Sequence, residues 1–251
     1  MEEQTSKVKS LAKALRVLEC FTSERPELGV TEISRMMELQ KSTVHNIVST
    51  YEDLGYLMQN QETGKYRLGI KLLQFSYIIN NHMGLQKFFL PYLQEIASKV
   101  NEIVYLGIPH EGDVLYIDSQ APAGISLTRN ILGEHAPMYC TGLGKAMLAF
   151  LPEEERNRCL NRPLTPFTEN TIRTREEMLG ELEQIRRRGY AIDNMEHEYG
   201  ITCISVPVFG HDRRLVSAVS ISAPSLRFDH DTLEKNARIM QDILAPAQRI
   251  L

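Results

Sequence analysis

The stretch from Leu39 to Leu57 constrains the fold of this chain more than any other segment. Apolar residues recur along it at three- and four-residue spacing, which predicts an amphipathic helix that ends at Gly55 and leads into a strand. These apolar residues are Val44, Ile47, Val48, Tyr51 and Leu54. The first turn of the helix is polar instead, and its side chains can hydrogen-bond to base edges or phosphates. They are Gln40, Lys41, Ser42, Thr43, His45 and Asn46. We expect this helix to read DNA.

Two shorter helices are predicted upstream of this stretch. The first covers residues 10–21, and the second runs from Thr31, the expected N-cap, to Met37, with Ile33 and Met36 facing inward. The apolar residues that would pack the first helix on a core are Leu11, Ala14, Leu15, Leu18 and Phe21.

A β-hairpin is predicted downstream, from residues 56–60 and 65–68, with Gly64 supplying the positive φ of the turn. Three helices followed by a hairpin indicate a winged helix-turn-helix domain over residues 1–69. Its third helix would enter the major groove of DNA.

The charge of this domain limits how it can bind DNA. Through Ile70 the chain has nine Lys and Arg against ten Asp and Glu, so the domain is not basic overall. The positive charge that would face DNA is local: Lys41 on the helix, and Lys65 and Arg67 on the wing. Few phosphate contacts per chain favour a dimer that doubles them. The alternative is a small helical domain whose polar face meets only water.

Composition indicates a two-domain cytoplasmic protein. A chain of 251 residues with 43% hydrophobic content can bury a sizeable core, and its net charge of -4 exerts no long-range attraction on nucleic acid or anionic membranes. No apolar run approaches the roughly 18 residues of a membrane-spanning helix, and residues 1–5 are no signal peptide. The four cysteines form no C-x-x-C pair, so we expect reduced thiols.

Residues 70–84 read as a linker helix, followed by a second domain over 85–251. The linker has an apolar stripe that would pair with a second chain or dock on its own domain. The second domain is predicted to be α+β with a mainly antiparallel sheet. Its expected strands are 103–109, 114–118, 201–209 and 215–222, and its expected helices are 85–100, interrupted near Pro91, 142–150, 175–188 and 229–250.

An enzymatic site in the second domain is the rival interpretation. Cys203, His197 and Asp193 contain the nucleophile, base and orienting acid of a catalytic trio, and the same residues are chemically able to bind a metal. However, a cysteine among apolar strand neighbours is usually an inert thiol, and the spacing matches no standard metal motif. The run 141–145 also fails as a phosphate loop, because Tyr139 stands where the first glycine is required. We therefore expect no catalytic residues, metal or cofactor.

A pocket for a small anion explains these residues better. Gly142, Leu143 and Gly144 open a helix, where free N–H groups and missing side chains let a carboxylate approach. Ser220 and Ser222 are two apart on a strand and therefore share one face of the sheet. With Cys203 on a neighbouring strand they would line a small cavity of mixed polarity. The alternative is that the two serines face bulk water.

The chain resembles the IclR family of bacterial transcription regulators over essentially its whole length. The second domain contains Gly189-x3-Asp193-x2-Glu196-x6-Cys203-Ile-Ser, which is similar to that family's signature. The segments 141–146 and 220–224 are similar to its effector-pocket segments. The resemblance implies a GAF-like α/β effector-binding domain, a linker helix that mediates dimerisation, and a dimer or tetramer on operator DNA.

The resemblance also implies which residues contact the effector, a small organic acid. The glycine-loop amides and the serines would hold its carboxylate, and Asp193 would hold its far polar end. The residues carried over are Gly142, Leu143, Asp193, Cys203, Ser220 and Ser222. Two positions depart from the family: Asn46 stands where many members have arginine, and Tyr51 where leucine is usual. The resemblance therefore implies a ligand-responsive repressor or activator without naming its ligand or operator.

Overall fold

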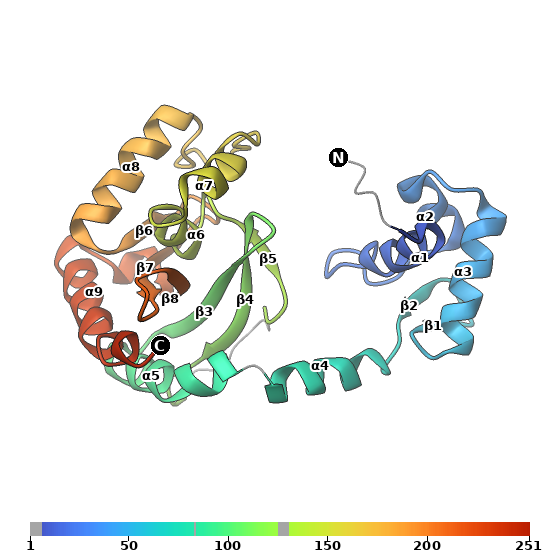
Figure 1. Ribbon diagram of the computed structural model, residues 1–251, viewed down its shortest axis with the longest axis horizontal. Coiled ribbons are helices and arrows are strands. Elements are labelled where there is room, and N and C mark those ends of the chain that lie inside the picture. Colours follow the sequence, from blue (N-terminus) through green and yellow to red (C-terminus); the bar gives the residue numbers. More distant parts are fainter. Residues whose placement is uncertain (1–6, 83, 125–130) are drawn as a thin grey trace. The chain divides into compact units, whose positions relative to one another are not determined.

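The computed structural model describes residues 7–82, 84–124 and 131–251, which divide into two compact units, Met1–Met83 and Gly84–Leu251 (Figure 1). Residues 1–6, to which the expectation of no signal peptide refers, lie outside the described residues, as does Met83 within the expected linker. No described helix has both the length and the apolar character needed to cross a bilayer.

The first unit contains a winged helix-turn-helix, as predicted. Strands β1 and β2 pair antiparallel, with Leu57 opposite Leu68, and Gly64 adopts a φ of 67° in the turn between them. The elements are α1 (Lys9–Glu19), α2 (Val30–Met37), α3 (Lys41–Asp53), β1 (Leu57–Gln59) and β2 (Tyr66–Leu68). A core shared by all of them holds α3 in place, and its members include Val17, Cys20, Phe21, Ile33, Val44, Val48, Leu57 and Tyr66.

Three details of the helix predictions were wrong. Leu11 and Leu15 are 57% and 50% exposed, because burial on α1 begins at Val17 and its first two turns extend past the core. Met36 is also exposed, at 40%. The N-cap of α2 is Gly29 rather than Thr31, since the Gly29 N–H donates to the Glu32 carboxylate at 2.7 Å.

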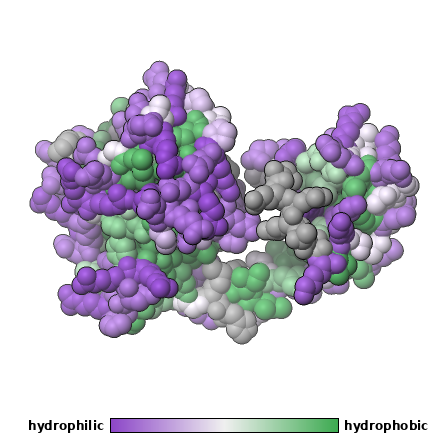
Figure 2. Space-filling model, turned by 45° about the horizontal axis from the view of Figure 1, so that its top comes forward, coloured by the Kyte–Doolittle hydropathy of each residue, from purple (hydrophilic) through white to green (hydrophobic). Residues whose placement is uncertain are grey.

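Helix α4 (Leu72–His82) begins docked on the winged domain. The rings of Tyr56 and Phe75 stack with centroids 6.0 Å apart, and the Lys71 ammonium donates to the Leu54 carbonyl at 2.8 Å. Several apolar side chains of the helix are nevertheless exposed, and Figure 2 shows hydrophobic surface at this part of the chain. The side chains of Leu73, Tyr77, Ile78 and Ile79 are each more than half exposed.

The second unit is built on an antiparallel sheet of six described strands in the order β5-β4-β3-β8-β7-β6. The two predicted hairpins, β3 with β4 and β7 with β8, are confirmed. The short strands β5 and β6 were missed, because three or four residues show no clear alternation. The bounds are β3 (Ile103–His110), β4 (Asp113–Gln120), β5 (His135–Pro137), β6 (Ala191–Asn194), β7 (Ile201–Phe209) and β8 (Leu215–Pro224).

Helices cover both faces of this sheet (Figure 1). Helices α5 (Gly84–Val100) and α9 (His230–Leu244) pack on one face. On the other, α6 (Gly142–Leu148) contacts the central strands and α8 (Arg175–Arg188) packs outside it. The chain also forms α7 (Glu153–Leu160) and the 3-10 turns η1 (Ser225–Arg227) and η2 (Ala247–Arg249).

Two predicted helix ends differ from the structure. Helix α5 continues through Pro91 instead of breaking there, and its face toward the sheet is buried at Phe89, Leu93 and Ile96. Burial of this face outweighs the one backbone hydrogen bond that proline removes. The last helix ends at Leu244 rather than near residue 250, because Pro246 follows and cannot continue it.

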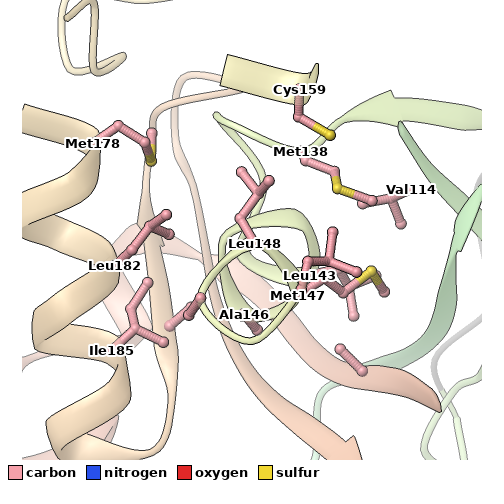
Figure 3. Packing of buried hydrophobic residues seen from close by; sticks show 14 of the residues in the cluster. Val114, Met138, Leu143, Ala146, Met147, Leu148, Cys159, Met178, Leu182 and Ile185 are labelled. Carbon is pink, nitrogen blue, oxygen red and sulfur yellow. The ribbon is translucent and has the colours of Figure 1, made fainter. Parts of the chain in front are cut away.

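Helix α6 is buried along its whole length between the sheet and α8. Figure 3 shows Leu148 of α6 toward Leu182 and Ile185 of α8, and Leu143 and Met147 on the other side of α6, toward Met138 and Val114. The helix also lies against the segment before it, because a Cβ at Gly144 would come within 2.2 Å of the Met138 Cα.

Replacement of Gly144 therefore tests how tightly α6 is held. We expect Gly144→Ala to lower the free energy of unfolding by about 2–3 kcal/mol or more, since the added methyl meets backbone that cannot move aside. Gly180→Ala in α8 is the matched control: nothing lies within 4 Å of its Cβ. It should raise stability by roughly 0.5–1 kcal/mol. Urea denaturation measures both, and equal stability of the two variants would contradict this packing.

Candidate functional site

The polar turn predicted to meet DNA is exposed at the start of α3. Gln40, Lys41, Ser42, Thr43, His45 and Asn46 are all exposed, while Val44 and Val48 are fully buried behind them. The helix is thus anchored by one face and presents the opposite face to solvent. No acidic residue lies between Leu39 and Tyr51, so this surface carries only the charge of Lys41.

The two predicted wing cations differ in their surroundings. Arg67 is exposed on β2, whereas Lys65 pairs with the Glu32 carboxylate at 3.0 Å. The Gly29 N–H and the Lys65 ammonium together hold the pKa of Glu32 below its ordinary value, so the Glu32 carboxylate is ionised at neutral pH. Lys65 must leave or share this partner to contact a phosphate.

The second predicted site lies on the sheet face beneath α6. The β7–β8 register sets Cys203 opposite Ser222 and Ser205 opposite Ser220. Asp193 on β6 is opposite Cys203 in turn. Side chains at directly opposed positions share a face. The sheet therefore brings together the acid, the thiol and the hydroxyls that are separated by up to 29 positions in the sequence.

Gly142 lets the helix lie directly on these hydroxyls. A Cβ at this position would come within 2.5 Å of the Ser205 Oγ and 3.2 Å of the Cys203 Cβ. The Ser205 and Ser220 hydroxyls are 2.8 Å apart, and both side chains are almost completely buried. Ser220 also donates to the Ile204 carbonyl at 3.2 Å. The buried pair thus forms the floor under the first turn of α6.

The neighbouring residue pair on the same sheet face is more accessible to solvent. Cys203 and Ser222 are partly exposed, and their Sγ and Oγ atoms lie 3.4 Å apart. At the helix start the Thr141 Oγ1 accepts a hydrogen bond from the Gly144 N–H at 3.2 Å. The Gly144 amide is therefore not free, which differs from the expectation drawn from the sequence. The N–H groups of Gly142 and Leu143 have no acceptor among the described residues. Two amides, a hydroxyl and a thiol therefore lie at this edge of α6.

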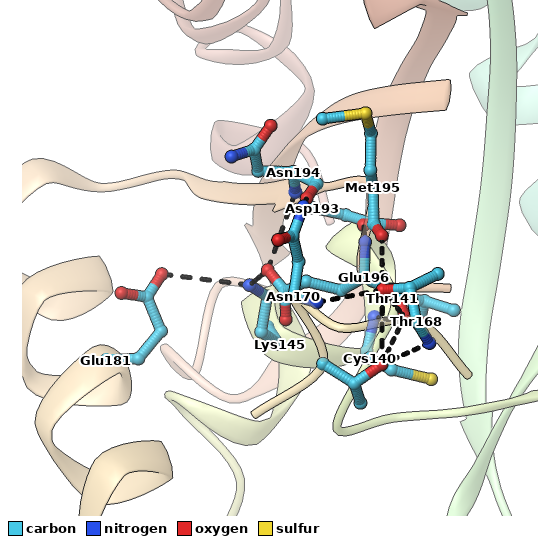
Figure 4. Close-up of polar contacts among 12 residues, drawn as sticks. Cys140, Thr141, Lys145, Thr168, Asn170, Glu181, Asp193, Asn194, Met195 and Glu196 are labelled. Carbon is cyan, nitrogen blue, oxygen red and sulfur yellow. Dashed lines mark hydrogen bonds and ion pairs between the residues drawn. The ribbon is translucent and has the colours of Figure 1, made fainter. Parts of the chain in front are cut away.

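A buried lysine fastens α6 to the loop that follows β6. Lys145 is 1% exposed, and its ammonium pairs with the Glu196 carboxylate. A second carboxylate, from Glu181 of α8, lies 3.9 Å away (Figure 4). Glu196 is 5% exposed, and its Oε2 has no hydrogen-bond partner among the described residues. Breaking such a buried pair by removing one partner usually destabilises a protein strongly.

Asp193 is buried beside this pair. Its Oδ1 accepts the Glu196 N–H at 2.7 Å. Burial raises the pKa of the Asp193 carboxyl to about 7, against the Glu196 amide and the Lys145 ammonium, which lower it. Asp193 thus exchanges a proton near neutral pH and can either donate or accept a hydrogen bond.

The catalytic and metal-binding alternatives are not favoured by this geometry. Burial raises the pKa of the Cys203 thiol, which opposes formation of the nucleophilic thiolate. The His197 ring packs against Phe167 with centroids 5.0 Å apart, and the Cys203 sulfur contacts Ser222. In the described part of the chain, no three His, Cys, Asp or Glu side chains are grouped as metal ligands would be.

Several residues of this site were not predicted. Ser205 obeys the same two-residue alternation that singled out Ser220 and Ser222, so the sequence contained a signal for it. From the sequence, Lys145 and Glu196 were recognised only as members of two separate motifs. Their ion pair joins positions that are 51 residues apart. Tyr116 of β4 is partly buried near Cys203 and Asp193, and its removal from water raises its pKa. No local pattern distinguishes it from an ordinary strand tyrosine.

Family comparisons match the whole arrangement. The model of the IclR helix-turn-helix domain matches residues 10–61, and that of the bacterial transcriptional regulator IclR C-terminal domain matches residues 78–250. The chain belongs to the IclR family of bacterial transcriptional regulators. It is a DNA-binding regulator and not an enzyme, and the resemblance noted from its motifs is confirmed.

Individual relatives agree with this family. The HTH-type transcriptional regulator XynR of Escherichia coli is 34% identical over 223 residues, which cover 88% of each chain. The crystal structure of IclR from Thermotoga maritima is 29% identical, covers 96% of this chain and 98% of that one, and has a TM-score of 0.72. An IclR homologue from Microbacterium hydrocarbonoxydans complexed with 4-hydroxybenzoate is 24% identical, covers 95% and 100%, and has a TM-score of 0.76.

The raised pKa of Asp193 makes a prediction about stability and pH. The folded state holds this proton up to about pH 7, whereas an unfolded aspartate releases it at its ordinary pKa of 3.8. The stability that the protonated group provides is therefore lost as the pH rises through 7. Asparagine stays neutral at every pH. As the pH rises from about 4 to 8, we therefore expect the free energy of unfolding of Asp193→Asn to increase by on the order of 2–4 kcal/mol relative to that of the parent.

Urea denaturation at several pH values measures this gain. Asp212→Asn, in the exposed β7–β8 turn, is the control and should follow the parent at every pH. If the free energies of unfolding of Asp193→Asn and the parent differ by the same amount at every pH, Asp193 is ionised in both the folded and the unfolded state.

Proposed function

We propose that the exposed first turn of α3 enters the major groove of operator DNA. Burial of Val44 and Val48 fixes the rotation of the helix, so that Gln40, Lys41, Ser42, Thr43, His45 and Asn46 face outward together. Lys65 and Arg67 contact the backbone from the wing. The observation that carries this proposal is a fully exposed polar helix face on a winged helix-turn-helix of a regulator family.

A second copy of the chain covers α4. We divide the chain into a DNA-binding domain (1–69), a linker and dimerisation helix (70–84) and an effector-binding domain (85–251). Leu73, Ile78 and Ile79 are exposed on one short helix, and apolar surface of this kind marks an interface. Pairing through α4 gives a homodimer that binds two half-sites, and two dimers form a tetramer.

The effector is a small organic acid bound beside α6. The amides of Gly142 and Leu143 and the Ser222 hydroxyl hold its carboxylate, with Cys203 beside them and Ser220 in the floor beneath. Asp193 holds its far polar end. The support is the convergence of these groups on one sheet face, together with the 4-hydroxybenzoate bound by a homologue of the same fold.

The acid regulates DNA binding if it binds one arrangement of the dimer more tightly than another. A tenfold change in operator affinity corresponds to about 1.4 kcal/mol, which a single charge-assisted hydrogen bond supplies. Helix α4 is stacked on the winged domain through Tyr56 and Phe75, so a change at this helix reaches the DNA-binding unit directly. The protein acts in the cytoplasm, where it represses or activates its operon.

Substitutions on α3 test the DNA-binding surface. Lys41→Gln should weaken binding to DNA from the protein's own promoter at least about tenfold, because each subunit of the dimer loses one phosphate contact. The slope of log affinity against log salt should fall in magnitude by about 1.8, or about 0.9 for each subunit. Lys235→Gln on α9 removes the same charge outside the surface and should change neither quantity. Fluorescence anisotropy at several salt concentrations measures both, and equal effects of the two substitutions would refute the assignment.

Two serines of β8 on opposite sheet faces test the effector site. Ser222→Ala should abolish the increase in melting temperature produced by the binding acid in a panel of small carboxylic acids that includes 4-hydroxybenzoate. Ser217→Ala removes a buried hydroxyl without a hydrogen-bond partner among the described residues, so it should keep the full increase. Both variants should bind promoter DNA normally. An unchanged thermal shift in Ser222→Ala would exclude Ser222 from the site.

A further inference from the structure

A second cavity lies at the opposite end of β7 from the effector site. It occupies about 640 Å³ between the residue Phe150 that follows α6, the β7–β8 turn and the C-terminal turn η2. Its lining includes Phe150, Phe209, His211, Arg213, Gln248 and Arg249. This volume is within the range of cavities that bind small molecules. Cys203 and Phe209 are six residues apart on one strand, which separates the two sites by roughly 20 Å.

Two aromatic rings give this cavity an apolar wall. Phe150 follows α6 and Phe209 ends β7, and their rings meet edge to face with centroids 4.9 Å apart. Both side chains are only partly buried, so ring surface remains accessible. The Phe209 N–H donates to the Gln248 side chain at 3.4 Å, which ties η2 to the end of the strand. A flat or branched apolar group fits against such a pair of rings.

The rest of the lining is polar and contains two arginines, Arg213 and Arg249. His211, Arg213 and Arg249 are exposed, and no carboxylate of the described residues pairs with any of them. The adjacent Arg214 differs, since its guanidinium lies 3.5 Å from the Asp212 carboxylate. No acidic side chain is among the residues that line the cavity. Two guanidinium groups without a partner beside an apolar wall are suited to a carboxylate.

The backbone at Arg213 adds an independent observation. This residue has a φ of 61°, a left-handed conformation that glycine or asparagine adopts at lower cost. The turn is closed by hydrogen bonds of 2.9 Å from the Arg213 N–H to the Gly210 carbonyl and from the Gly210 N–H to the Arg214 carbonyl. The turn therefore holds Arg213 in one backbone conformation at the rim of the cavity.

We propose that this cavity is a second ligand site for a small aromatic or branched carboxylate. The apolar body of the ligand packs against Phe150 and Phe209, and its carboxylate is bound by Arg213 and Arg249. The site is distinct from the pocket beside the first turn of α6, and its occupancy does not depend on that pocket.

Binding of 4-fluorobenzoate to the full-length protein tests this site. In fluorine NMR titrations at millimolar probe, the double variant Arg213→Gln with Arg249→Gln should bind at this site at least tenfold more weakly, because both cations are lost. Arg214→Gln, in the same turn but already paired with Asp212, is the control and should bind like the parent. The uncharged 4-fluorobenzamide should bind the parent weakly.

Hydrogen exchange of the parent localises the same probe. Added 4-fluorobenzoate should slow exchange of the amides in residues 208–214 and 246–251. Protection of residues 140–147 alone would assign the probe to the effector pocket and overturn the proposal. Unchanged affinity in the double arginine variant, or no binding by the parent at millimolar probe, would also overturn it.

Discussion

The close approach of α6 to the sheet is the constraint on which the effector-binding domain depends. Gly142 lies against the Ser205 hydroxyl and Gly144 against the Met138 backbone, and side chains at either position would separate the layers. Because α6 lies so close to the sheet, the amides of its first turn are next to Cys203 and Ser222. Beyond the C-terminal end of α6, the ring of Phe150 contacts that of Phe209. The two ends of one short helix therefore lead to the two proposed sites.

The buried charged side chains on and around α6 link neighbouring elements of the domain, which is a structural role and not a catalytic one. Lys145 is enclosed by carboxylates from two other elements, so α6, α8 and the loop after β6 are joined by one ammonium group. Asp193, beside this ion pair, carries a carboxyl whose pKa is raised to about 7 by burial. Nucleophilic chemistry has no comparable support, since burial raises the pKa of the Cys203 thiol. The groups at this site are suited to holding a ligand.

Two regions show how far local patterns could predict this fold. Strands β7 and β8 were predicted nearly to the residue, because apolar alternation between turn residues is a strong local signal. Helix α5 was wrongly broken at Pro91, because its continuity depends on burial against the sheet, which no local propensity reports. Leu11 and Leu15 have the spacing of core residues but are exposed, since the core ends before it reaches them.

The sequence by itself determined the winged helix-turn-helix, the antiparallel α+β domain and the family, because each depends on periodicity, turn residues or a long spaced motif. It also placed Ser220 and Ser222 on one face, since alternation along a strand is a local property. Only the tertiary structure decided that Ser205 pairs with Ser220, that Lys145 meets Glu196, and that Arg213 and Phe150 line one cavity. These arrangements join residues 15 to more than 60 positions apart, and strand register and helix packing bring them together.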